Sequence, residues 1–539
     1  VVAFSLRVGQ SQPIYAAAKA LAATEAEPMR KRILDKMVQS AELAGVALDG
    51  GKKARFNAIQ AELAKLATDF SNAVLDATKA FSLEKDGKTY TIDDANYPQT
   101  MKHCADRAVR EALCRARSTR APENTARIAR ILELRQELAA LLGFENYVEL
   151  SLATKCAPSS AAVFEMIDEL DAATKEVARP EDAELAALAA QDVGLATVEP
   201  WDRAYVAEKL REAKYAYSEE ELKRHFEFAD VLKGLFRMAN FLFDVEVEEW
   251  TDARKPQTWH PDVRFFAVKE NGRETAHFYL DPYVRSGLKN GGAWMNEFRN
   301  RSDRNGETPL SLIVLNLPLP DADGKCQMPF REVETLFHEF GHALQCMLTR
   351  VGEEGAAGIN LVEWDAVEVA SQFMENWCLD DRTGIEVPAE LKAKVRAAKN
   401  FRAASTCRRQ LAFAKTDLVL HSGAAGSKDA NDIKREIFTH FDYPMVPEDI
   451  FLNGFTHIFS GGYSAGYYGY KWSEVMSADC YGAFEEAGLD DDAAIRRTGA
   501  RYRETILGMG GSESAYDVFV KFRGRRPTSA ALLRQQGLA

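Results

Sequence analysis

The sequence lacks long hydrophobic runs. In its 539 residues no uninterrupted apolar stretch approaches the about 18 residues that a membrane-spanning helix needs, so we expect no transmembrane helix. Basic residues are also in the minority, because 68 Lys and Arg face 81 Asp and Glu and leave a net charge of −13. This balance argues against nucleic acid or an anionic membrane as a partner. The remaining composition, 46% hydrophobic and 28% charged, is typical of a globular protein.

Closely spaced cysteine pairs are missing as well. The eight cysteines are scattered along the chain, and none of them forms a C-x-x-C pair. This pattern is typical of free thiols, so we expect an intracellular, reducing compartment. The chain opens with "VVAFSLRVGQ", which has neither an initiator methionine nor a signal-peptide pattern. We therefore interpret it as a mature or trimmed chain.

Strand patterns are few and lie close together. Apolar alternation occurs at 244–250, two apolar runs flank an Asn-Gly turn in "VRFFAVKENGRETAHFYLD", and "PLSLIVLNL" at 309–317 predicts a further strand. Helical periodicity dominates elsewhere, at 12–84, 98–116, 122–142, 159–190, 203–241 and after 331. The sequence predicts a mainly α protein with an N-terminal helical lobe, 1–242, and a C-terminal lobe, 243–539, that contains a small sheet (243–317).

The stretch "LFHEFGHALQCML" places two histidines four residues apart. On a helix, His338 and His342 lie one above the other on one face, so both rings can point at a common atom. Glu339 lies beside that point rather than in it. This is the H-E-x-x-H pattern of zinc peptidases, in which the glutamate acts on a metal-bound water.

A buried helix that carries polar residues by chance is the alternative interpretation. Apolar side chains surround nearly the whole circumference of this helix, so it should be buried. Two histidines and a glutamate in such a place are costly without partners or a metal. Burial therefore favours the metal site.

A catalytic zinc ion usually has three protein ligands and one open position. The helical pattern "NLVEWDAVEVASQFMENW" downstream offers three carboxylates near one face, Asp365, Glu368 and Glu375. Spacing alone does not choose among them. Asp365 and Glu334 each lie one helical turn before a candidate ligand, so either is also a candidate for holding a ligand imidazole by a hydrogen bond.

Three long segments carry a resemblance to a known family. These are "TLFHEFGHALQCML", "WDAVEVASQFMENW" and "FTHIFSGGYSAGYYGYKWSEVMSADCYGAFEEAGL". Together they resemble the thimet oligopeptidase family of zinc metallopeptidases, and within it the oligopeptidase A branch with its plant and algal organellar relatives. The resemblance implies an elongated helical, two-lobed metallopeptidase with a deep central channel and one zinc ion on the channel floor. It also implies a cytosolic or a chloroplast or mitochondrial location.

The resemblance also implies roles for individual residues. His338, His342 and Glu368 match the family's zinc ligands, and Glu339 matches its general base. Tyr467 and Tyr470 match tyrosines that contact the reacting carbonyl, and His457 matches a histidine near the same place. A strand at 311–317 that lies at the sheet edge would pair with an extended substrate backbone.

We therefore predict a monomeric zinc endopeptidase that hydrolyses internal bonds of short unstructured peptides, such as targeting or degradation peptides. Two alternatives remain open. A dipeptidyl carboxypeptidase would need a cationic group for the substrate's C-terminal carboxylate, which the sequence cannot locate. A peptide-binding protein that retains zinc without turnover would have no need of Glu339, Tyr467 and Tyr470.

Overall fold

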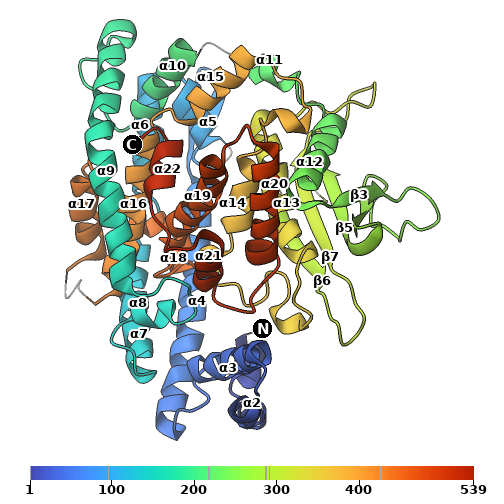
Figure 1. Cartoon of the computed structure of the whole chain (residues 1–539). Helices are drawn as coiled ribbons and strands as arrows, with labels where there is room; N and C mark the ends of the chain where they lie inside the picture. The colour runs from blue at the N-terminus through green and yellow to red at the C-terminus, as the bar shows by residue number, and fades with distance from the viewer. Residues whose placement is uncertain (1, 95, 216–218, 286–287, 290–291, 424–427) are drawn as a thin grey trace.

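The computed structural model describes residues 2–94, 96–215, 219–285, 288–289, 292–423 and 428–539. Helices dominate it, as the sequence predicts, and the molecule is elongated (Figure 1). The helices before the sheet are α1 Val2–Gly9, α2 Gln12–Thr24, α3 Pro28–Leu43, α4 Gly50–Ala80, α5 Tyr97–His103, α6 Arg107–Ser118, α7 Asn124–Leu141, α8 Tyr147–Leu152, α9 Ser160–Leu188, α10 Arg203–Tyr215, α11 Glu219–Lys223 and α12 Phe228–Phe243.

The chain after the sheet is again helical. Its helices are α13 Phe330–Met347, α14 Val369–Glu375, α15 Ala389–Lys399, α16 Ala403–His421, α17 Ala430–His440, α18 Thr456–Phe459, α19 Gly469–Ala487, α20 Asp492–Tyr502, α21 Ala515–Arg523 and α22 Ala530–Gln535. None of the helices in the described part of the chain is long and apolar enough to cross a membrane.

Two predicted helices are divided in the structure. The stretch 98–116 forms α5 and α6, because Asp106 accepts hydrogen bonds from the backbone N–H groups of Ala108 and Val109 and so starts a new helix. The stretch 203–241 forms α10, α11 and α12, and Glu227 caps α12 in the same way. The apolar periodicity of the sequence continues past these capping residues, so it does not reveal that one helix ends and another begins there.

A small sheet precedes α13, as predicted. Its strands are β3 Glu246–Glu249, β4 Arg264–Glu270, β5 Arg273–Tyr283, β6 Trp294–Arg299 and β7 Leu310–Leu317, in the order β3-β4-β5-β7-β6. The predicted hairpin is confirmed: β4 and β5 pair antiparallel around Asn271 and Gly272, which both have positive φ. β5 and β7 are parallel, and β6 pairs antiparallel with β7.

The expectation that 311–317 lies at the sheet edge is wrong. β7 pairs with β5 on one side and with β6 on the other, and the two edge strands are β3 and β6, of which β6 was not predicted from the sequence. The physical reason is visible in β7 itself, since its nearly continuous apolar run suits a strand that is buried and paired on both sides. A separate two-stranded hairpin, β1 Ser82–Lys85 and β2 Lys88–Thr91, was also missed.

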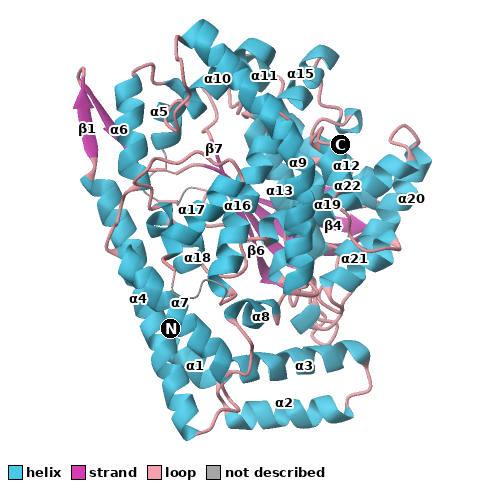
Figure 2. Cartoon of the chain, turned by 90° about the vertical axis from the view of Figure 1, so that its left-hand side faces the viewer, coloured by secondary structure: helices cyan, strands magenta, loops and turns pink. Residues whose placement is uncertain are grey.

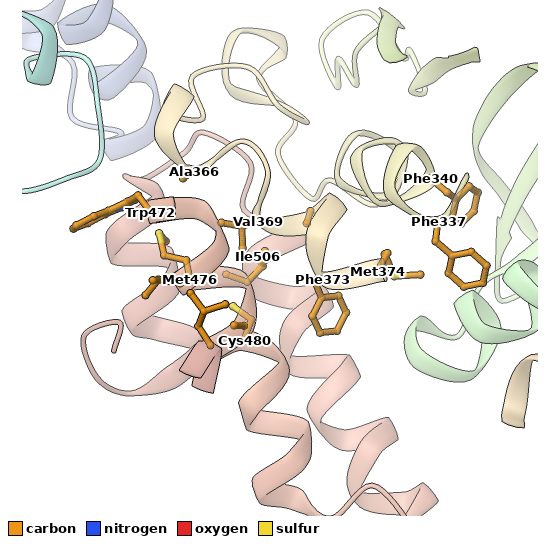
Figure 3. Close-up of a cluster of buried hydrophobic side chains, with 14 of the residues drawn as sticks. Phe337, Phe340, Ala366, Val369, Phe373, Met374, Trp472, Met476, Cys480 and Ile506 are labelled. Carbon is orange, nitrogen blue, oxygen red and sulfur yellow. The ribbon is translucent and has the colours of Figure 1, made fainter. Parts of the chain in front are cut away.

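The helix that carries His338 and His342 lies between the sheet and another helical layer. Phe340 of α13 packs against Phe278 of β5, with ring centroids 5.7 Å apart. α14 covers another side of α13 and packs in turn on α19. Figure 3 shows Val369 and Phe373 of α14 lying against Met476 and Cys480 of α19. The polar motif is therefore held in the largest apolar core of the molecule.

Segments far apart in the sequence meet opposite this sheet. The long helix α9 runs along one side of the molecule, with the sheet on the other side (Figure 1). α16, which follows the H-E-x-x-H helix in the chain, packs on α9 and α7 of the N-terminal half. The lobe boundary at 242/243 stays a prediction.

Candidate metal centre and active site

Two imidazoles and one carboxylate converge on a single point. The rings of His338 and His342 stand nearly perpendicular, with centroids 5.0 Å apart. The Nε2 atoms of both lie 3.2 Å from Oε2 of Glu368. One ligand atom from each residue lies within 4.8 Å of the others. Two imidazole nitrogens and a carboxylate oxygen form a donor set that fits a catalytic zinc ion.

Glu368 reaches this point because α14 approaches α13 very closely. Gly341, inside the H-E-x-x-H motif, makes the approach possible: a Cβ atom there would lie 2.5 Å from the carbonyl oxygen of Ala370 and 2.7 Å from Cα of Ser371. The Ser371 hydroxyl then donates a hydrogen bond of 2.9 Å to Oε2 of Glu368. The glycine of the motif thus sets the distance between the two ligand-bearing segments.

A fourth residue orients one of the imidazoles. Nδ1 of His338 donates to Oε1 of Glu375 over 2.7 Å, which leaves Nε2 free to face the convergence point. The two residues expected in this role lie elsewhere. Asp365 accepts from the backbone N–H groups of Cys156 and Ala157, and Glu334 pairs with Lys399. Neither therefore holds a ligand imidazole, and that expectation was wrong.

The electrostatics of the point favour a positive charge. Burial disfavours the charged form of His338, but its hydrogen bonds with Glu368 and Glu375 outweigh burial and raise the pKa of the imidazole to about 10. Nδ1 of His342 is buried, and no described residue forms a hydrogen bond with it. Two carboxylates around two histidines attract a cation, and a divalent metal ion satisfies this demand with both imidazoles neutral.

Glu339 is placed differently from the other carboxylates. Its residue is only 6% exposed, and it accepts a hydrogen bond from the backbone N–H of Met295 in the edge strand β6. Burial raises the pKa of Glu339, although the neighbouring histidines oppose the shift. A carboxylate with a raised pKa beside the convergence point is suited to take up and release a proton.

The Gly/Tyr-rich stretch brings three tyrosines together. The ring of Tyr470 lies 5.1 Å from that of Tyr463 and 5.2 Å from that of Tyr467. His457, whose pKa burial lowers, lies 5.7 Å from Tyr467 and 5.9 Å from Tyr463. Burial and a hydrogen bond with Tyr463 raise the pKa of Tyr470, and the charge of Glu368 adds to the shift. Tyr470 is therefore within reach of the charge of Glu368.

Tyr463 was missed by the sequence analysis. The signal that could have found it is the recurrence of tyrosines at 463, 467 and 470 in one glycine-containing stretch that leads into α19. Tyr467 differs from Tyr470, because its hydroxyl donates to Oε1 of Gln410 over 2.9 Å.

A buried aspartate anchors this tyrosine loop. The carboxylate of Asp417 accepts hydrogen bonds of 2.9 to 3.0 Å from three successive backbone N–H groups, those of Ala465, Gly466 and Tyr467. On the other side, the Tyr468 hydroxyl donates to Oδ2 of Asp365 over 2.8 Å. The loop is fixed through its backbone, so the rings of Tyr463, Tyr467 and Tyr470 are held together without depending on their own hydroxyls.

Another group of potential ligands lies on α5 and α10. Atoms of His103, Glu208 and Glu212 also come within 4.8 Å of one another. There, however, Glu208 pairs with Arg211 and Glu212 with Lys209, so both carboxylates already have cationic partners. The point on α13 is the better metal site, because among the described residues its carboxylates form ion pairs with imidazoles and with no lysine or arginine.

Curated relatives align along nearly the whole chain. Organellar oligopeptidase A, chloroplastic/mitochondrial, from Arabidopsis thaliana is 41% identical over 601 residues, covering 100% of this chain and 76% of the relative. Oligopeptidase A from Escherichia coli (strain K12) is 35% identical, covering 99% and 86%. Dipeptidyl carboxypeptidase from the same strain is 32% identical, covering 94% and 80%, and is thus a more distant match.

Solved structures share the fold. The chain in "PZ PEPTIDASE A with inhibitor 2" superimposes with a TM-score of 0.56 at 16% identity, over 97% of this chain and 83% of that one. The family model for the N-terminal domain of neurolysin and thimet oligopeptidase matches residues 1–53, and the model "Peptidase family M3" matches residues 100–538. The chain therefore belongs to peptidase family M3, a family of metallopeptidases.

Proposed function

We propose that this protein is a zinc-dependent oligopeptidase that cleaves internal bonds of short, unstructured peptides. The observation that carries the proposal is the convergence of His338, His342 and Glu368 on one point with Glu339 beside it. The relatives with the highest identities above are named oligopeptidase A, which supports endopeptidase rather than dipeptidyl carboxypeptidase specificity. The eight free cysteines support a reducing compartment inside the cell.

In this proposal His338, His342 and Glu368 hold the zinc ion, and Glu375 fixes the ring of His338. A bound zinc ion supplies Lewis-acid chemistry, withdrawing electron density from a peptide carbonyl and from water. Glu339 accepts the proton of the attacking water and passes it to the leaving amine. Its buried environment and raised pKa make both the uptake and the release of that proton favourable.

The developing oxyanion needs hydrogen-bond donors. We assign this role to Tyr470 first, because its hydroxyl is close enough to Glu368 to feel its charge. Tyr467 and His457 complete the aromatic cluster and contact the substrate on the same side. The raised pKa values of Tyr467 and Tyr470 keep both tyrosines protonated at pH 7, and the lowered pKa of His457 keeps the histidine neutral.

The ligand assignment is tested by Glu368→Ala. We expect this variant to lose zinc and activity together, because two imidazoles alone do not complete a catalytic site. Zinc content is measured by elemental analysis after gel filtration, and peptide cleavage by mass spectrometry. Full zinc occupancy in Glu368→Ala would refute the assignment.

Mapping the bonds cleaved in free and C-amidated peptides separates an endopeptidase from a dipeptidyl carboxypeptidase, which requires a free C-terminus.

A further inference from the structure

A second large feature of the molecule is a cavity of about 810 Å³ in the half of the molecule that contains α9 and α16. It lies between α5, α6, α9, the start of α16 and the segment 441–451. In the view of Figure 2, α5, α6 and α10 lie above α16 and α17. Its volume is in the range of ligand-binding cavities. No residue of the convergence point on α13 lines it.

The lining of this cavity is strongly basic. Eight of its residues are lysine or arginine and three are aspartate, although the whole chain carries a net charge of −13. An excess of one sign inside a concave surface focuses the electrostatic potential there. Carboxylates outside the lining pair with three of these side chains, Arg117, Arg179 and Arg408, so the excess of positive charge rests on the other basic residues.

Two of these arginines have no carboxylate partner among the described residues. Arg120 is partly buried, its Nε has no hydrogen-bond partner, and its Nη1 makes only a long contact of 3.4 Å to the Thr78 hydroxyl. Burial and the nearby charge of Arg117 lower the pKa of Arg120 to about 10. Arg409 is exposed, and its guanidinium lies 5.2 Å from the ring centre of Phe413. Among the described residues neither guanidinium forms an ion pair with a carboxylate, although the charge of Asp94 acts on Arg120.

A third arginine is only partly compensated. Arg402 and Arg203 share a single carboxylate, that of Asp182, and the buried Nε of Arg402 has no partner. The charge of Glu181 also acts on Arg402, but this carboxylate accepts hydrogen bonds from Ala404 and Ser405 and forms no ion pair with either arginine in the described part of the chain. Unsatisfied guanidinium N–H groups that are shielded from bulk water are the donors that best match a carboxylate.

The cavity adjoins the tyrosine cluster of the proposed active site. Phe413, on which Arg409 stacks, lies 5.8 Å from the ring of Tyr467. The charge of Arg409 acts on Tyr467 and opposes the rise of its pKa. Gln410, the next residue, accepts the hydrogen bond of the Tyr467 hydroxyl. The basic cavity and the tyrosine cluster are therefore neighbours, linked through Arg409 and Phe413.

We propose that the basic cavity binds a carboxylate of the peptide substrate, a few residues from the bond that is cleaved, through Arg120, Arg402 and Arg409. The proposal rests on the proposed peptidase function and adds a substrate class to it: peptides with an acidic residue or the C-terminal carboxylate at that place. The carboxylate supplies the negative charge that the lining lacks, and the guanidinium groups fix its position relative to the reacting carbonyl.

The test is a set of peptides with one cleavage site and a single variable position. Glu, Gln or Lys is moved stepwise along one neutral sequence, and each peptide is made with a free and with an amidated C-terminus. For wild-type protein we expect Glu to raise kcat/KM over Gln by about three- to tenfold at two or three adjacent positions on one side of the bond, and Lys to lower it. The preference should decrease as NaCl is raised, because salt screens partly exposed charges.

Variants of the cavity test whether it causes the preference, and the free and amidated peptides show whether the carboxylate is a side chain or the C-terminus. Arg409→Gln, an exposed position, should remove most of the preference, and Arg120→Gln should do the same if thermal unfolding shows that it is folded. Arg273→Gln, at the exposed turn of β4 and β5, makes the same change in net charge and should keep the preference. A gain that appears only with free C-termini, at a fixed distance from the bond, identifies the C-terminal carboxylate.

Binding is measured independently of turnover with the zinc-loaded Glu339→Gln variant by calorimetry on the same peptides. Equal kcat/KM and equal Kd for Glu, Gln and Lys peptides at every position would overturn the inference, while internal cleavage of those peptides would leave the proposed function intact. If wild-type protein cleaves none of the peptides, the proposed function fails, and the Kd values still decide whether the cavity prefers a carboxylate.

Discussion

Three glutamates of the proposed active site have separate environments. Glu368 and Glu375 each face a histidine nitrogen, at 3.2 and 2.7 Å, so their charge is used to hold imidazoles or a metal. Glu339 has instead a backbone N–H as its hydrogen-bond donor, and burial raises its pKa. The pKa of Glu339 is thus raised while that of Glu368, which is needed to hold the metal, is lowered by its histidine partners.

From this difference we predict the effect of Glu339→Gln. The amide keeps the size and the hydrogen bond from Met295 but cannot take a proton. Turnover should fall by about 10²–10⁴ while zinc remains bound, since general base catalysis contributes that much. Steady-state kinetics and elemental analysis on the same sample give both quantities. Near-normal turnover in the zinc-loaded variant would mean that the proton goes to another group.

The two candidate tyrosines should differ in their importance. Tyr470→Phe should reduce kcat by about 10²–10³ with little change in KM, because the hydrogen bond strengthens as the oxyanion forms. Tyr467→Phe should have a smaller effect on kcat, since its hydroxyl already donates to Gln410. The measurement is kcat and KM of both variants with one peptide. A change in KM alone for both would remove the oxyanion role.

Some of these residues could be predicted from the sequence and others could not, for a physical reason. The spacing of His338 and His342 reflects local helix geometry, so five residues are sufficient to predict it. Helical spacing did not determine which of Asp365, Glu368 and Glu375 is the third ligand. Glu368 lies just before the first residue of α14 and Asp365 lies in a short 3-10 helix, so the three residues do not share one regular helix. Glu375 reaches His338 from the far end of α14, which is a tertiary contact.

At the scale of elements, the close packing of α13 and α14 decides where Glu368 lies. A Cβ atom at Gly341 would meet backbone atoms of Ala370 and Ser371, which cannot rotate away as a side chain could. Gly341→Ala must therefore push α14 outward and move Glu368 with it. The substitution changes the metal site through the backbone, without altering any ligand.

We predict that Gly341→Ala lowers zinc affinity by about 10- to 100-fold, as expected for a change that displaces a ligand. Overpacking should also destabilise the fold by about 1–3 kcal/mol. Zinc affinity is measured by competition with a chelator, and stability by chemical denaturation. Gly51→Ala is the matched control, because nothing lies within 4 Å of a Cβ there. Zinc affinity equal to that of the control would show that α14 does not set the ligand position.

The elements that the sequence did not predict share a cause. The hairpin of β1 and β2 turns at Asp86 and Gly87, both with positive φ, but its strands are four residues each and mostly exposed, so their apolar pattern is weak. The edge strand β6 is also largely exposed and follows a glycine-rich stretch. By contrast, β4, β5 and β7 are buried, and their apolar runs were predicted correctly. Burial is what leaves a readable pattern in the sequence.

At the scale of the whole molecule, the proposed site is built by the C-terminal half of the chain and supported by helices of the N-terminal half. The H-E-x-x-H helix lies on the sheet, while the tyrosine loop is anchored by Asp417 of α16, a helix that packs on α9 and α7. The basic cavity combines α5, α6, α9 and α16 in the same way. Such long-range assembly has no local sequence signal, so the cavity and its charge became visible only in the structure.

Substrate size should follow from the deep central channel that the family resemblance implies. In such a channel we expect only an unfolded segment to reach Glu339. Unfolding a substrate domain would cost about 5–15 kcal/mol, and even a disordered protein would have to enter as a loop, two strands wide. Peptides of up to a few tens of residues should therefore be cut at internal bonds, and casein-like unfolded proteins poorly or not at all. The measurement is kcat/KM for peptides of one composition and increasing length, with full-length casein as the upper limit. A rate that is independent of length, or efficient digestion of casein, would mean that the site is open to solvent from the side.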